Sequence, residues 1–152
     1  MTSWVCIDAN VVLKLVLNEE YSEQADALWS DFKSQAYTII APPLAIYEIA
    51  AVLRQTVHRG EIDPGEGREA LAAILQLGIG TIEPVDLHLQ AYDLATRFNL
   101  PATYDASYLV VAESLGCEFW TADRRLVNAV SRDLPWVKWL GNYSPPDSES
   151  DS

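Results

Sequence analysis

Cysteine, histidine and basic residues are all scarce in this chain of 152 residues. Its two cysteines, Cys6 and Cys117, and its two histidines, His58 and His88, lack the spacing of a zinc site. The cysteines are also too few for a disulfide framework, so we expect both to be small buried apolar side chains. No apolar run approaches the length of a membrane span, and the first run, interrupted by Asp8, lacks the basic start of a signal peptide. We therefore expect a cytoplasmic protein with no membrane-spanning segment.

Positive charge is the other shortage, because 10 Lys and Arg stand against 22 Asp and Glu, a formal net charge of -12. This balance argues against nonspecific nucleic-acid binding, which neutralises phosphates with Lys and Arg. An acidic protein can still act on nucleic acid where a divalent metal neutralises the reacting phosphate and a few basic residues flank the site. The charge therefore leaves metal-dependent chemistry open.

Length and composition indicate one globular domain followed by a short tail. The chain is 49% hydrophobic and 21% charged, which is enough apolar material for a buried core. We expect this domain to cover residues 1–143. Residues 144–152 read SPPDSESDS and offer no apolar surface to offset the entropy of ordering, so we expect a disordered acidic tail there.

Short apolar runs alternate with amphipathic segments along the domain, and they predict buried strands alternating with helices. The expected strands are 3–7, 37–41, 81–85, 118–120 and 136–140. The expected helices are 10–16, 22–33, 44–58, 63–75, one capped by residue 86 and running to 98, 104–115 and 121–130. This alternation predicts right-handed crossovers and an α/β fold, a three-layer α/β/α sandwich around a mainly parallel sheet of four to five strands.

Four acidic residues fall where parallel sheets form their functional sites, at the carboxyl ends of strands and the adjacent helix starts. Asp8 directly follows the first expected strand, and Asp123 lies three residues beyond the fourth, in the first turn of a helix. Asp105 is at the start of the helix 104–115. Glu48 lies on the helix 44–58 among apolar neighbours, where an ionised carboxylate needs a partner such as a metal.

Each acid taken alone has a simpler explanation. Asp105 and Asp123 are favoured in a helix first turn by capping or by the macrodipole, Asp8 could cap the next helix, and Glu48 could face solvent. Neither capping nor core packing explains four acids that reach one edge of the sheet from four different elements. A carboxylate cluster suits one or two Mg²⁺ or Mn²⁺ ions, which prefer oxygen ligands, and such ions suit phosphodiester hydrolysis. Our hypothesis is a metal-dependent nuclease.

Basic and aromatic residues beside these acids are candidates for substrate contacts. The candidates are Lys14, Arg124 and Arg125 for flanking phosphates, and Tyr104 and Tyr108 for stacking on an unpaired base. Solvated surface charge is the alternative explanation for the basic residues, and ordinary packing with a wet hydroxyl is the alternative for the tyrosines.

In chain order the motifs are C-I-D-A-N at residues 6–10, Y-E at 47–48, Y-D-A-S-Y at 104–108 and T-A-D-R-R-L at 121–126. This set resembles the PIN domain, and more narrowly the VapC-type ribonuclease toxins of toxin-antitoxin pairs, over nearly the whole chain except the tail. The resemblance implies an endoribonuclease in which Asp8, Glu48, Asp105 and Asp123 bind Mg²⁺ or Mn²⁺. It further implies that Asn10 and Thr121 support these acids by hydrogen bonds, and that a homodimer and a cognate antitoxin protein exist.

Three other readings compete with the nuclease. A phospho-receiver domain needs adjacent acids after its first strand, whereas Asp8 stands alone, and a haloacid-dehalogenase-type phosphatase needs an Asp where this chain has Asn10. A catalytically silent PIN-like module that binds a protein partner is the stronger alternative. The presence of all four acids argues against it.

Overall fold

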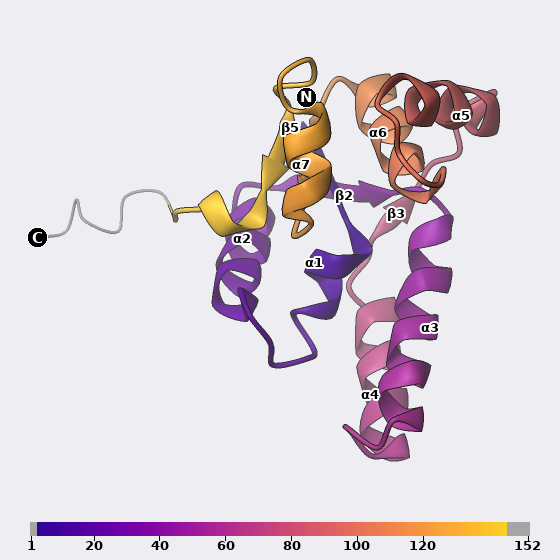
Figure 1. The fold of residues 1–152 in the computed structure, drawn as a ribbon. Helices are drawn as coiled ribbons and strands as arrows, with labels where there is room; N and C mark the ends of the chain where they lie inside the picture. Colours follow the sequence, from indigo (N-terminus) through magenta and orange to yellow (C-terminus); the bar gives the residue numbers. More distant parts are fainter. Residues whose placement is uncertain (1–2, 146–152) are drawn as a thin grey trace, which may run out of the picture.

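The computed structural model describes residues 3–145, and at its centre lies a five-stranded parallel sheet (Figure 1). The strands are β1 (Ser3–Ile7), β2 (Tyr37–Ala41), β3 (Gly80–Thr81), β4 (Glu118–Thr121) and β5 (Val137–Trp139). Their order across the sheet is β3-β2-β1-β4-β5, and every neighbouring pair is parallel. The acidic tail expected over residues 144–152 lies, from residue 146 onward, outside the described residues.

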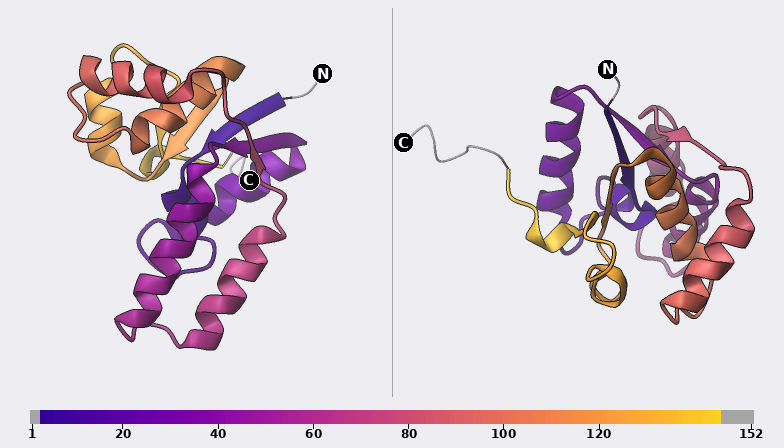
Figure 2. Two further views of the ribbon diagram at one scale, coloured as in Figure 1. Left: turned by 90° about the vertical axis from the view of Figure 1, so that its right-hand side faces the viewer. Right: turned by 90° about the horizontal axis from the view of Figure 1, so that it is seen from above.

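Helices cover both faces of this sheet, as expected for a parallel sheet whose central strand is apolar from Trp4 to Ile7. Helix α6 (Tyr104–Leu115) packs against β1 and β4, and α5 (Leu87–Arg97) lies outside α6. Helix α2 (Ser22–Ser34) covers the opposite face, as the right-hand view of Figure 2 shows. The short α7 (Arg124–Val130) packs beside β5, and a 3-10 turn, η1 (Leu140–Asn142), contacts α2. The predicted three-layer α/β/α sandwich is confirmed.

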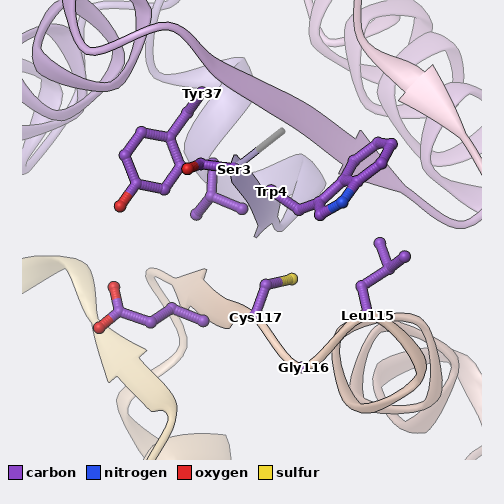
Figure 3. A pocket seen from close by; sticks show the side chains of 8 residues that line it. Ser3, Trp4, Tyr37, Leu115, Gly116 and Cys117 are labelled. Atoms are coloured by element: carbon purple, nitrogen blue, oxygen red, sulfur yellow. The ribbon is translucent and has the colours of Figure 1, made fainter. Parts of the chain in front are cut away.

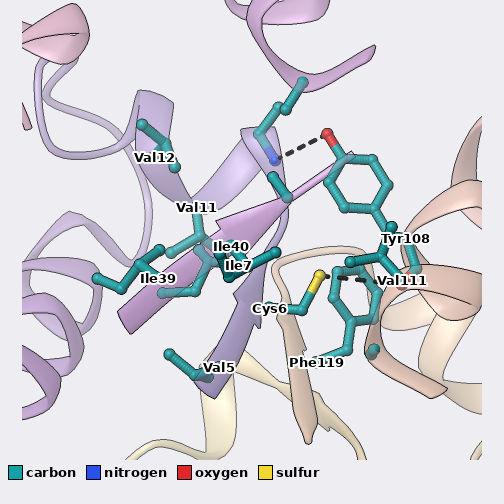
Figure 4. Packing of buried hydrophobic residues seen from close by; sticks show 14 of the residues in the cluster. Val5, Cys6, Ile7, Val11, Val12, Ile39, Ile40, Tyr108, Val111 and Phe119 are labelled. Carbon is teal, nitrogen blue, oxygen red and sulfur yellow. Dashed lines mark hydrogen bonds between the residues drawn. The ribbon is translucent and has the colours of Figure 1, made fainter. Parts of the chain in front are cut away.

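The core fills both spaces between the sheet and its helices. Val5 of β1 and Ile39 of β2 lie on one face of the sheet, while Cys6 of β1 packs with Tyr108 and Phe119 on the other face (Figure 4). Both cysteines are free; Cys6 is buried and Cys117 is half-buried. The burial of Cys6 agrees with its expected role as a small apolar side chain.

A helical pair projects from the carboxyl edge of the sheet (Figures 1 and 2). It consists of α3 (Leu44–His58) and α4 (Pro64–Leu75). Gly67 permits their close approach, because a Cβ atom there would lie 2.5 Å from Cγ2 of Val57. Asp63 and Glu66 form a capping box at the start of α4. None of the described helices is long and apolar enough to span a membrane.

Several elements have the predicted bounds, among them β1, β2, α3 and α6. The strand predicted over 81–85 is wrong in extent: β3 is an edge strand of two residues, and Pro84 lacks the N–H needed to continue a ladder. Asp86 precedes α5 but has a φ of 61° and makes no side-chain capping bond. Thr121, predicted to open a helix, is instead the last residue of β4.

Candidate active site

Side-chain hydrogen bonds join the carboxyl ends of the neighbouring strands β1 and β4. Asp8 follows β1, and its backbone N–H donates to the Trp120 carbonyl of β4 at 3.0 Å, which brings Thr121 alongside. The Thr121 hydroxyl donates to Oδ2 of Asp8 at 2.8 Å. Asn10 donates from Nδ2 to Oγ1 of Thr121 at 3.3 Å, and its Oδ1 accepts from the Ala122 N–H at 3.0 Å. Asp8, only 5% exposed, is therefore held in a network that joins both strand ends.

Helix α1 (Ala9–Leu13) begins on this same turn. Oδ1 of Asp8 accepts from the Asn10 N–H at 3.3 Å, so Asp8 is the N-cap of α1 and takes one donor on each carboxylate oxygen. The capping explanation for Asp8 is thus correct. Capping uses only Oδ1, so it does not explain why Oδ2 accepts a hydrogen bond from the buried Thr121 hydroxyl.

Asp123 is the N-cap of α7. Its Oδ1 accepts from the N–H groups of Arg125 and Leu126 at 3.0 and 3.2 Å, and its own N–H donates to Oγ1 of Thr121 at 3.0 Å. Both capping bonds fall on Oδ1, which leaves Oδ2 out of the cap. Thr121 therefore links Asp8 and Asp123 through a single hydroxyl group.

Glu48 reaches this edge of the sheet from α3, the helix that follows β2. It is half-buried, and its Oε1 accepts a hydrogen bond of 2.6 Å from the Tyr108 hydroxyl. That hydroxyl also accepts from the Ala9 N–H at 3.3 Å, a bond drawn in Figure 4. Glu48 is thereby connected to the residue that follows Asp8.

The ionisation of Asp8, Glu48 and Asp105 is perturbed by burial and by neighbouring carboxylates. Burial raises the pKa of Asp8 to about 7, with further increases from the charges of Asp105 and Glu48 and an opposing effect of the Thr121 hydrogen bond. Burial also raises the pKa of Glu48, and Asp105 adds to it against the Tyr108 bond. The pKa of half-buried Asp105 is raised by burial and by Asp123. Acids from four distant parts of the sequence thus share one electrostatic site.

A hydrated divalent ion fits this donor set. Within residues 3–145 no three His, Cys, Asp or Glu side chains lie together as a ready-made metal cage. Mg²⁺ does not require one, because it keeps several waters and is usually held by one or two carboxylates. The donors here are carboxylate oxygens. Burial is the main cause of the raised pKa of Asp8, and the repulsion from Asp105 and Glu48 that adds to it would be relieved by a divalent cation.

The residues predicted to contact substrate have different surroundings. Tyr104 is 60% exposed. Lys14 is mostly buried and its Nζ pairs with Glu19 at 3.1 Å. Arg124 and Arg125 are exposed beside Asp123, and the guanidinium of Arg124 lies 4.7 Å from the ring centre of Trp139.

The prediction that Tyr108 stacks on a base is wrong. Its side chain is fully buried, its ring stacks on Phe119 with centroids 5.4 Å apart, and burial together with nearby carboxylates raises its pKa far above the usual value. A base cannot reach this ring. Tyr47, which directly precedes Glu48, is 77% exposed.

A cavity of about 380 Å³ lies at the opposite end of the sheet. It is lined by Ser3, Trp4, Tyr37, Leu115, Gly116 and Cys117 among others (Figure 3). These residues surround the amino ends of β1, β2 and β4, whereas Asp8 and Thr121 are at the carboxyl ends of β1 and β4. The cavity is therefore separate from the acidic cluster.

The part of the chain that matches known proteins includes all four acids of this site. The family model described as the PIN domain matches residues 5–131. Ribonuclease VapC9 of Mycobacterium tuberculosis is 32% identical over 131 residues, which are 86% of this chain and 94% of that protein. The crystal structure of PAE2754 from Pyrobaculum aerophilum matches with a TM-score of 0.63 and 26% identity, covering 85% of this chain and 87% of that one. The structure of VapC20 of M. tuberculosis, titled a sarcin-ricin loop cleaving toxin, has a TM-score of 0.64 at 17% identity and covers 83% and 95%, a likeness of fold.

Proposed function

The chain belongs to the PIN domain family, and from that premise we propose that it is a cytoplasmic endoribonuclease of the VapC toxin type. The supporting observation is the convergence of Asp8, Glu48, Asp105 and Asp123 on one sheet edge, in a chain 32% identical to a named ribonuclease. The substrate is RNA, and the reaction is hydrolysis of its internal phosphodiester bonds.

Asp8 and Asp105 are the proposed direct ligands of Mg²⁺ or Mn²⁺, with Glu48 and Asp123 completing the acidic quartet. One or two such ions, when bound, neutralise the phosphate and lower the pKa of a water. Thr121 and Asn10 hold Asp8 in place through the bonds described above. Asp8, whose pKa is about 7 without metal, would release its proton to solvent if it bound the ion.

Exposed residues near the quartet are proposed to hold the RNA strand. Arg124 and Arg125 follow Asp123 directly and suit flanking phosphates, and exposed Tyr104 precedes Asp105 and suits stacking on an unpaired base. Lys14 would have to leave Glu19 to serve the same purpose. These assignments rest on position and exposure.

A cognate antitoxin protein and a homodimer are further proposals, and they follow from the VapC type. Light scattering of the purified chain tests the homodimer. The alternative function is a catalytically silent PIN-like module that binds a protein partner, and it predicts no RNA cleavage.

A cleavage assay on a single-stranded RNA with Mg²⁺ or Mn²⁺ tests the function. Asp8→Asn and Glu48→Gln should each reduce the rate by more than about 100-fold, since each removes a carboxylate of the quartet. Glu113→Gln is the matched control, because Glu113 is exposed at the far end of the same helix as Asp105 and should leave the rate unchanged. Activity that persists in both variants, or in EDTA, would contradict the proposal.

A further inference from the structure

We propose that Tyr108 is a positioning residue that orients the Glu48 carboxylate toward the cation, through one hydroxyl shared with the main chain beside Asp8. The inference rests on the proposed metal-dependent function. It assigns Tyr108 a role in the site in place of the base-stacking role that its burial excludes.

The direction of both hydrogen bonds is fixed by chemistry. A phenol has a single proton, and the Ala9 N–H can only donate, so the hydroxyl accepts from Ala9 at 3.3 Å and must direct its proton to Oε1 of Glu48 at 2.6 Å. Oε1 is therefore committed as an acceptor. The orientation of the whole carboxylate, and hence the position of Oε2, follows from this bond.

The tyrosine is held firmly enough to act as a fixed support. Its ring stacks on Phe119 of β4 at an interplanar angle of 26°, and the side chain is fully buried. Its carbonyl accepts from Sγ of Cys6 on β1 at 3.8 Å. A group packed in this way has one available rotamer, whereas the half-buried Glu48 side chain would otherwise sample several.

One hydroxyl thus joins three elements that carry acids of the quartet. Tyr108 is on α6 with Asp105, Glu48 is on α3, and Ala9 opens α1 directly after Asp8. The Ala9 N–H is among the first donors of α1, which have no partner inside the helix. The Tyr108 hydroxyl, which accepts from Ala9 and donates to Glu48, therefore sets the spacing between the Glu48 carboxylate and the turn at Asp8.

Removing the hydroxyl should weaken cation binding without removing a ligand. Tyr108→Phe keeps the ring and its stacking on Phe119, so the fold should survive, but Glu48 loses its fixed donor. Groups that orient metal ligands in this way typically contribute 10- to 100-fold to affinity. We expect the Kd for Mn²⁺ to rise by about 10-fold or more in Tyr108→Phe.

The test is calorimetric titration of the full chain with Mn²⁺, with circular dichroism to verify the fold of each variant. Tyr143→Phe is the matched control, since it removes a hydroxyl that donates to Asp31, outside the quartet, and should leave the Kd unchanged. If Tyr108 acts through Glu48, adding Tyr108→Phe to Glu48→Gln should change the Kd by less than about twofold.

The outcomes separate this inference from the proposed function. Mn²⁺ binding that is weakened by Glu48→Gln but equal in parent and Tyr108→Phe would overturn the positioning role and leave the metal site intact. A variant that is merely less stable, with an unchanged Kd, would also overturn it. A folded parent that does not bind Mn²⁺ at all would overturn both proposals.

Discussion

At Asp8, burial and hydrogen bonding act on one carboxylate in opposite directions. Burial and neighbouring acids favour the protonated form, while the Thr121 hydroxyl and the Asn10 N–H favour the ionised form. Burial prevails, and the pKa is about 7. The metal-free site is therefore a place where ionisation opposes folding.

The first prediction follows from the upward direction of this pKa shift. Because the folded pKa of Asp8 is raised from 3.8 to about 7, the native state binds the proton more tightly, and stability should fall as pH rises between those values. Asp8→Asn cannot ionise. From about pH 5 to about pH 8 without metal, the unfolding free energy of the variant should gain roughly 2 to 3 kcal/mol relative to the parent. Urea unfolding at both pH values measures it, and a pH-independent difference would contradict it.

A second prediction concerns the Thr121 hydroxyl, which donates to Asp8 and accepts from Asn10 and the Asp123 N–H. Thr121 is fully buried, so Thr121→Val keeps the volume but leaves these groups without their partner. Stability should fall by about 1 to 3 kcal/mol, and Thr121→Ser should recover most of it. Chemical denaturation of both variants decides the matter; equal stability of Val and Ser would show that the hydroxyl contributes nothing.

At this scale the sequence predicts the four acids but not the hydrogen bond that Tyr108 donates to one of them. Asp8, Asp105 and Asp123 could be predicted because each follows a strand or begins a helix, and Glu48 because its neighbours at helical spacing are apolar. Tyr108 could not, since α6 is buried on nearly every side from Ala106 to Ala112. With no polar face, helical spacing does not indicate which of its residues meets Glu48.

At the scale of elements, Asp123 shows that capping and function are not exclusive explanations. Oδ1 caps α7, while the same carboxylate raises the pKa of Asp105. The strand β4 runs one residue further than predicted, which makes Asp123 the N-cap of α7 in place of a first-turn residue. Thr121 suits either a strand end or a helix start in sequence terms, and only its pairing with Trp139 of β5 decides.

The third prediction separates the two roles of Asp123. Asp123→Ala removes both capping bonds and should cost about 1 kcal/mol of stability, while Asp123→Asn keeps a capping oxygen and should stay near the parent. Both should weaken Mn²⁺ binding if Oδ2 is a ligand. Thermal melts with and without Mn²⁺ measure the two effects together. An Asn variant that matches the parent in Mn²⁺-induced stabilisation would leave Asp123 as a cap only.

At the scale of the whole molecule, strand order decides where the site forms. The chain places β2 on one side of β1 and β4 on the other, so the order reverses at β1, and Asp8 follows that strand. Open α/β sheets form their sites at such a switch point. The alternation of strands and helices predicted the parallel sheet. It could not predict which strands flank β1, because that depends on packing between residues more than 100 positions apart, such as Cys6 and Phe119.

The net charge of -12 also belongs to the whole molecule, and it leads to the last prediction. Each phosphate contact by a basic residue adds about 0.7 to the salt dependence of single-strand binding. Arg124 and Arg125 are exposed beside the quartet, whereas Lys14 is already paired with Glu19. We therefore expect a shallow slope of log K against log salt, of magnitude about 1 to 2.

This slope can be measured by fluorescence anisotropy of a labelled single-stranded RNA, with Asp8→Asn to prevent cleavage, between about 50 and 300 mM salt. Replacing Arg124 and Arg125 together by Ala should remove most of the dependence. Arg132→Ala should leave it unchanged, because exposed Arg132 follows the far end of α7 from Asp123. A steep slope that survives loss of both arginines would mean that RNA contacts a different surface. That result would contradict the proposed role of Arg124 and Arg125 in holding the RNA strand.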